Sequence, residues 1–126
     1  MSNQQPLSRY ADVLLMKAEA LLRSGTSLDE ALASVNEVRR RAYSGSTAFD
    51  WTMADLTLPN LLAERGRELS WELVRRTDVI RFGTFGNAKT YPPKPADADD
   101  HFELLPIPVA QHLTNPNLTQ NPGYSW

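Results

Sequence analysis

Two segments with helical apolar spacing, separated only by GTS at residues 25–27, are the feature that most constrains the fold. Apolar side chains recur at the spacing of one helix face in residues 9–24 and again in residues 28–42. Gly25 can supply the left-handed residue that ends the first helix. Because so short a connection joins helices only as an antiparallel pair, the sequence predicts a helical hairpin over residues 9–43.

The residues before each of these helices predict how the helices begin. Ser8 can cap the first helix with its hydroxyl oxygen. Ser27 and Glu30 have the S-x-x-E spacing of a capping box, in which each side chain accepts a hydrogen bond from the backbone amide of the other residue. The sequence therefore predicts side-chain caps at Ser8 and Ser27.

A third, longer helix is predicted to begin near Thr57, with Pro59 in its first turn, and to run to residue 75 or 76. Gly66 lies inside it and costs up to ~1 kcal/mol relative to alanine, which a close helix contact would offset. A short final helix is predicted over residues 77–83, capped by its first residue and stopped by the glycine at its last. Helix is thus expected through residues 57–83.

Residues 84–126 show no clear helical periodicity. Residues 84–100 are polar and broken by prolines, whereas FELLPIPVAQHL after them carries apolar residues beside its own prolines. The prolines of LPIP exclude a central strand or helix, so an extended segment lying on the helices is expected there, followed by one helical turn at residues 109–113. The chain ends in NPNLTQNPGYSW, whose prolines and asparagines favour consecutive tight turns. We expect this tail to anchor Leu118 and Tyr124 against the helices.

Composition limits the possible functions. The chain has 126 residues, a net charge of −2 and no cysteine. The charge does not favour nucleic acid, and the absence of cysteine excludes disulfides, thiolate chemistry and cysteine zinc sites. No apolar run reaches the ~18–20 residues that span a bilayer, and residues 1–10 lack an export signal and a lipidation cysteine. One domain over residues 1–126, without a cofactor, is expected.

Three glutamates, Glu64, Glu68 and Glu72, follow one another at four-residue intervals. On one helix they would share a face, whereas a glycosidase needs two carboxylates separated across a cleft. Ion pairs within the helical pack are therefore favoured, with partners among the arginines that surround the row, namely Arg65, Arg67, Arg75, Arg76 and Arg81. A glycoside hydrolase that uses the glutamate row is a distant alternative.

Neither His101 nor His112 has the spacing of a metal ligand or a catalytic pair. The aspartates of PADADDHFE lack the glycine and distal glutamate of a calcium-binding loop, so a solvated acidic loop is favoured. We predict no metal site and no catalytic residue. Trp51, Tyr91 and Phe85 are aromatics in expected loops; they could anchor the loops or stack on sugar rings. Trp51 and Tyr91 are the ligand-binding candidates.

Three blocks together resemble one family. RYADVLLMKAEALLRSG followed by ALASVNEVRRRA resembles its helical hairpin. The family's ER-x-x-EL helix and R-x-x-D-[LVI]-[IV]-R turn are similar to the block LLAERGRELSWELVRRTDVIRFGTF. Its terminal signature, a LPIP step followed by NPNL-x-QNPGY, is similar to the block LLPIPVAQHLTNPNLTQNPGY. These are hallmarks of the C-terminal part of SusD/RagB-type proteins. The sequence departs from them at Leu73-Val74, where the family often has a glycine-containing step, and at Arg76, where an aromatic is usual.

The resemblance implies an all-α fold with a tetratricopeptide-like hairpin, a long helix and an irregular C-terminal segment wrapping the helices. It implies a non-enzymatic surface lipoprotein of the outer membrane that binds oligosaccharide and delivers it to a TonB-dependent transporter. The lipid anchor would lie outside this chain, which is then a C-terminal fragment or a reduced relative. A helical protein-interaction module with no sugar contact of its own is the alternative.

Overall fold

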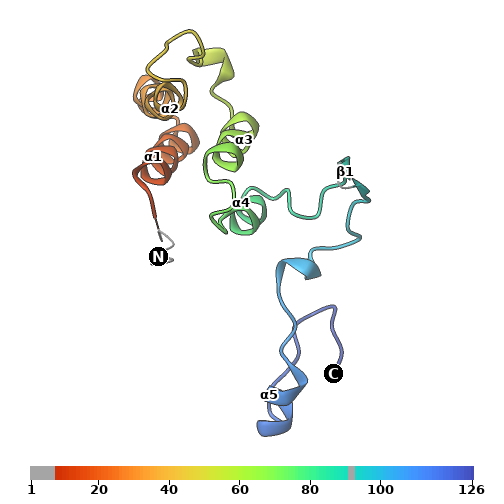
Figure 1. The fold of residues 1–126 in the computed structure, drawn as a ribbon. Helices are drawn as coiled ribbons and strands as arrows, with labels where there is room; N and C mark the ends of the chain where they lie inside the picture. Colours follow the sequence, from red (N-terminus) through yellow and green to blue (C-terminus); the bar gives the residue numbers. More distant parts are fainter. Residues whose placement is uncertain (1–7, 91–92) are drawn as a thin grey trace. The chain divides into compact units, whose positions relative to one another are not determined.

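A computed structural model describes residues 8–90 and 93–126, which divide into two compact units, Met1–Arg75 and Arg76–Trp126 (Figure 1). The elements of the first unit are α1 (Tyr10–Ser24), α2 (Leu28–Ala42), the 3-10 turn η1 (Met53–Asp55) and α3 (Leu58–Glu68). The chain continues with α4 (Arg75–Arg81), β1 (Lys89–Thr90), β2 (Pro93–Lys94), the 3-10 turn η2 (His101–Glu103) and α5 (Val109–Thr114). The two short strands pair antiparallel. The prediction of an all-α fold is confirmed.

The first unit is the predicted helical hairpin with a third helix against it. Gly25 takes the left-handed conformation, with φ of 69°, and its amide donates to the carbonyl of Leu22. The chain turns back at this glycine, and α1 and α2 pack along each other while α3 lies against α1 (Figure 1). The largest fully buried side chains are Leu15, Val35 and Leu61, one from each helix. The three helices therefore share one apolar core.

Both predicted side-chain caps are wrong. The residue at the N-cap position of α1 is Arg9 rather than Ser8, and its side chain makes no capping hydrogen bond. Ser27 does precede α2, but its backbone is left-handed, with φ of 47°, and its hydroxyl makes no capping hydrogen bond. The carboxylate of Glu30 does not bond back to Ser27 but lies 2.6 Å from Nζ of Lys17. An ion pair between the two helices thus replaces the local capping box.

The third helix, α3, begins where the sequence predicts but ends at Glu68, earlier than the predicted end at residue 75 or 76. The hydroxyl of Thr57 accepts the amide of Asn60, and a proline stands in the first turn. The helix stops at Glu68, whose carbonyl accepts a 2.7 Å hydrogen bond from Arg9. The amide of Glu72, which would bond this carbonyl in a continuous helix, turns to another carbonyl of the loop. A hydrogen bond from Arg9, distant in the sequence, therefore accompanies the end of the helix at a point where the apolar periodicity predicts that it continues.

The short helix after this turn is α4, which begins at residue 75 rather than at Thr77, so Thr77 lies inside the helix and does not cap it. Gly83 ends it in the left-handed conformation, with φ of 65°, as predicted. The predicted single turn at residues 109–113 is α5. Within the described residues, no helix is both long and apolar enough to cross a membrane.

Candidate functional site

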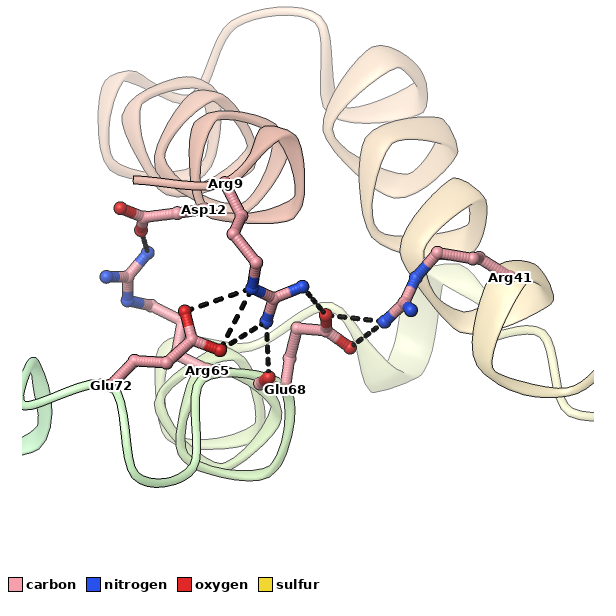
Figure 2. A network of polar contacts seen from close by, with 6 residues as sticks. All are labelled: Arg9, Asp12, Arg41, Arg65, Glu68 and Glu72. Atoms are coloured by element: carbon pink, nitrogen blue, oxygen red, sulfur yellow. Dashed lines mark hydrogen bonds and ion pairs between the residues drawn. The ribbon is translucent and has the colours of Figure 1, made fainter. Parts of the chain in front are cut away.

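Arg9, just before α1, binds two glutamates at the end of α3 and beyond it (Figure 2). Its Nε lies 2.9 Å and 3.0 Å from the carboxylate oxygens of Glu72, and its Nη2 lies 2.6 Å from one of them. Its Nη1 donates to the carboxylate of Glu68 over 2.9 Å. One planar guanidinium therefore ties the start of α1 to the end of α3 and to the following turn.

The same cluster extends to α2 and along α3. Arg41 of α2 donates to both carboxylate oxygens of Glu68, over 2.5 Å and 2.7 Å. On the other side of Arg9, Nη1 of Arg65 lies 2.9 Å from a carboxylate oxygen of Asp12 (Figure 2). The side chain of Arg65 is 4% exposed, so this pair is removed from water. Ion pairs thus join all three helices. We call this cluster the polar network; it consists of residues 9, 12, 41, 65, 68 and 72.

A second cluster lies around Glu64 of α3. One of its carboxylate oxygens lies 2.8 Å from Nη1 of Arg39 and 2.5 Å from Nη2 of Arg67. Nε of Arg39 also donates to the carbonyl of Phe49 over 2.8 Å, which fixes the loop between α2 and η1. This cluster holds the loop that carries Trp51 against the helices.

The hypothesis that the glutamate row forms ion pairs is confirmed. Of the arginines expected from the neighbouring sequence, Arg67 binds Glu64 of the row. Arg9, Arg39 and Arg41 also bind the row; they come from α2 and from the residue before α1, and no local sequence pattern predicts them. Local spacing identifies charges on one helix, but only the packing of helices decides which distant side chains face them.

Arg9 also sets the protonation of the carboxylate that it binds. Hydrogen bonds from its guanidinium, and then its charge, hold the pKa of Glu72 below the ordinary value of 4.5. The same contacts, with Glu72 first and Glu68 second, raise the pKa of Arg9. The pair is therefore charged across the whole neutral range.

The turn after α3 presents two apolar residues in an unusual backbone conformation. Trp71 and Leu73 have φ of 67° and 63°, in the left-handed region that costs a side-chain-bearing residue about 1–2 kcal/mol. Their exposed fractions are 94% and 84%. The sequence places both inside a helix, so it misses this turn; the departure from a glycine step at Leu73 is the signal that could have located it.

Gly66 makes room for a side chain rather than for a helix. A Cβ at this position would lie 2.9 Å from Nη1 of Arg75, which donates to the carbonyl of Leu62 over 2.9 Å. The predicted helix contact is thus a guanidinium at the end of the turn. The turn of residues 69–74 is held by Arg9 through Glu72 and by Arg75, the residue that follows it.

The two predicted ligand-binding residues have different positions. Trp51 is half-buried and packs against the core, and Asn36 holds its backbone with hydrogen bonds of 2.7 Å to its amide and 3.0 Å to its carbonyl. The guanidinium of Arg39 lies 5.4 Å from its ring centroid. Tyr91 lies outside the described residues. Phe85, the third loop aromatic, has the guanidinium of Arg76 at 4.6 Å.

A groove of about 280 Å³ lies between α1 and α2. Its floor is apolar and its rim carries charged and aromatic side chains; the lining residues are Arg9, Tyr10, Ala11, Leu14, Glu37, Val38 and Arg41. Arg9 and Arg41 belong both to this rim and to the polar network. The groove therefore combines an apolar surface with hydrogen-bonding groups, as small-ligand sites do.

In the second unit the tail folds back on the LPIP segment. The side-chain amide of Gln120 accepts the amide of Ile107 over 2.8 Å and donates to its carbonyl over 3.0 Å, as a neighbouring strand would. Asn121 donates to the carbonyl of Leu105 over 2.7 Å, and the hydroxyl of Tyr124 donates to that of Leu104 over 3.0 Å. The expected placement of the tail against the helices stays a prediction.

His101 and two aspartates of this unit form local pairs. His101 bonds Asp99, and Nζ of Lys94 lies 2.7 Å from a carboxylate oxygen of Asp97. Hydrogen bonds from the backbone and then the ring of His101 lower the pKa of Asp99. Within residues 8–90 and 93–126, no three histidine, aspartate or glutamate side chains gather as metal ligands would.

Comparison with known proteins places most of the chain in one group. A family model described as the SusD family matches residues 2–124. The chain is 32% identical over 125 residues to the starch-binding protein SusD of Bacteroides thetaiotaomicron, covering 94% of this chain and 21% of that relative. It is 35% identical over 127 residues to SusD-like protein P2 of Formosa agariphila, covering 92% and 25%.

The fold of the chain also matches a solved structure from the same superfamily. The crystal structure of a SusD superfamily protein from Bacteroides vulgatus matches with a TM-score of 0.77 at 33% identity, covering 95% of this chain and 28% of that chain. The chain thus spans between 21% and 28% of the length of these three proteins.

Proposed function

Because the chain belongs to the SusD family, we propose that it forms the C-terminal part of a surface lipoprotein that binds oligosaccharide. The observation that carries this proposal is the 32% identity to a starch-binding protein over 94% of the chain. The polar network and the tail contacts lie in the blocks that carry the family resemblance, so this chain supplies framework for the binding protein. Delivery of the bound glycan to a TonB-dependent transporter completes the proposed role.

Binding without bond cleavage fits the state of the acidic residues. Glycoside hydrolysis needs two carboxyl groups at a fixed separation, one of them with a raised pKa. Each of Glu64, Glu68 and Glu72 is held by arginine, and the pKa of Glu72 is lowered rather than raised. These glutamates are therefore arranged to fix the helices, and we propose that the protein is not an enzyme.

Calorimetric titration tests the proposal. A panel of linear oligosaccharides (maltoheptaose, cellohexaose, laminarihexaose and xylohexaose) is titrated into this chain and into the full-length lipoprotein. The proposal expects the full-length protein to bind at least one of them, with no release of reducing ends on prolonged incubation. Trp51→Ala, measured in both proteins, tests the sequence-predicted sugar contact; Tyr91→Ala does the same for the second candidate.

Failure of the full-length protein to bind any glycan of the panel, together with capture of a membrane transporter in a pull-down, would favour a protein-interaction module instead. Cleavage of a glycan that Glu68→Gln abolishes would overturn the non-enzymatic role. Binding that survives Trp51→Ala would remove Trp51 from the site without affecting the proposed function.

A further inference from the structure

The strongest unexplained feature is Trp71. At 94% exposure it is the most exposed large apolar side chain in the described part of the chain. A tryptophan that serves only packing is mostly covered, because its ring has the largest apolar area of any side chain. Trp71 shares its turn with Leu73, which is 84% exposed, so two large apolar side chains face solvent on one short segment.

The turn that carries Trp71 is held in place before any ligand arrives. Glu72, the next residue, receives three hydrogen-bond contacts from Arg9, and its amide donates to the carbonyl of Leu69 over 3.1 Å. Trp71 and Leu73 on either side keep left-handed backbones. Strain of this kind persists where surrounding contacts fix the backbone, so the backbone of this turn needs little rearrangement when a ligand binds.

Arg9 connects this turn to the groove between α1 and α2. Its guanidinium holds Glu72, and the same residue lines the groove beside Tyr10. On the opposite rim stands Glu37, which is exposed and whose carboxylate forms no hydrogen bond or ion pair with residues 8–90 or 93–126. The surface therefore offers an exposed indole ring on the turn, a groove with an apolar floor that shares Arg9 with this turn, and an exposed carboxylate at Glu37.

This combination suits a sugar chain better than an apolar helix. A pyranose ring has apolar C–H faces that stack on an aromatic ring and equatorial hydroxyls that donate to a carboxylate. An apolar helix seated in the groove would instead bring its surface against the carboxylate of Glu37, whose desolvation without a partner is costly.

Resting on the proposed function, we propose that Trp71 stacks on one pyranose ring of a bound oligosaccharide and that the α1–α2 groove receives a neighbouring sugar unit, with Glu37 accepting its hydroxyls. The chain is then both framework and part of the binding surface.

The experiment is calorimetric titration of the best-binding glycan of the same panel into this chain and into the full-length lipoprotein, each as wild type and as variants. Trp71→Ala is expected to weaken binding about tenfold because it removes the stacking ring. Trp71→Phe keeps a ring and is expected to retain most of the affinity. Glu37→Gln is expected to weaken binding about fivefold because it replaces a charged acceptor by a neutral one.

Two control variants distinguish the effect of losing the Trp71 ring from the effect of changing the turn and from the effect of losing a tryptophan elsewhere. Leu73→Gly keeps Trp71 and places at the left-handed position the residue that adopts it without strain, so the affinity is expected to stay unchanged. Trp126→Ala removes another exposed tryptophan, one whose ring stacks on His112 at 4.0 Å, and is expected to leave binding unchanged. Circular dichroism confirms that each variant keeps its helices.

The outcomes distinguish this inference from the proposed function. A full-length protein that binds glycan with the same affinity after Trp71→Ala overturns the inference and leaves the proposed function standing. If that variant also lowers the melting temperature of the full-length protein, Trp71 instead packs against another protein segment. A full-length protein that binds no glycan of the panel overturns both.

Discussion

Each of the two units of the chain is stabilised by a different kind of internal contact. The first unit contains the apolar core and the polar network, with Leu15, Val35 and Leu61 fully removed from solvent. In the second unit the described buried residues are Asp78 and Val79, and the tail is held by side-chain amides that bond backbone groups. Burial of apolar area stabilises a folded unit more than single hydrogen bonds do, so the first unit should be the more stable.

The largest effect is expected from the core of the first unit. Leu15→Ala removes a fully buried side chain and leaves a cavity, which costs about 2–5 kcal/mol of unfolding free energy. Leu105→Ala, in the second unit and 71% exposed, should change it by less than about 0.5 kcal/mol. Urea unfolding followed by circular dichroism measures both; equal effects would remove the contrast between the units.

The next effect concerns the polar network. Arg9→Gln removes several charge-assisted hydrogen bonds at once and should cost about 2 kcal/mol. Arg40→Gln is the matched control, because Arg40 is exposed and bonds the single carboxylate of Asp50, so its loss should move the urea midpoint far less. A midpoint for Arg9→Gln that equals that of the control would show that the network does not stabilise the helices.

A smaller and more local effect is expected in the tail. Gln120→Ala removes both hydrogen bonds to Ile107 and should cost about 1–2 kcal/mol locally. Hydrogen exchange at the Ile107 amide should become about tenfold faster, while α1 and α2 amides keep their rates. Gln111→Ala, an exposed glutamine on α5, is the control. Faster exchange throughout α1 and α2 would show that the two units unfold together.

The smallest effect is the acid dependence that Arg9 confers on the first unit. The pKa of Glu72 is lowered on folding, so its contribution to stability is complete above the ordinary value of 4.5 and is lost as the pH falls below it through the folded-state pKa. The wild type should therefore lose more stability than Arg9→Gln between neutral pH and about pH 3. Urea midpoints at the two pH values measure the difference, and parallel losses would contradict it.

Sequence periodicity and turn chemistry account for much of the fold. The hairpin, its left-handed Gly25, the start of α3 at Thr57 and the single turn of α5 follow from local rules. The errors occur where a distant partner intervenes. Glu30 pairs with Lys17 instead of closing a capping box, and Arg9 takes the carbonyl that would have continued α3. Local propensities are small, so one charged long-range contact can override them.

The candidate site divides in the same way. The sequence by itself determined the helical class, the presence of a paired glutamate row and the family resemblance, because these depend on residue order alone. Only the tertiary structure decided that Arg9 and Arg41 from before α1 and from α2 converge on Glu68, and that Trp71 stands exposed on a turn rather than inside a helix. Residue order fixes which groups are neighbours along the chain, whereas packing brings distant groups within hydrogen-bonding distance and leaves others in solvent.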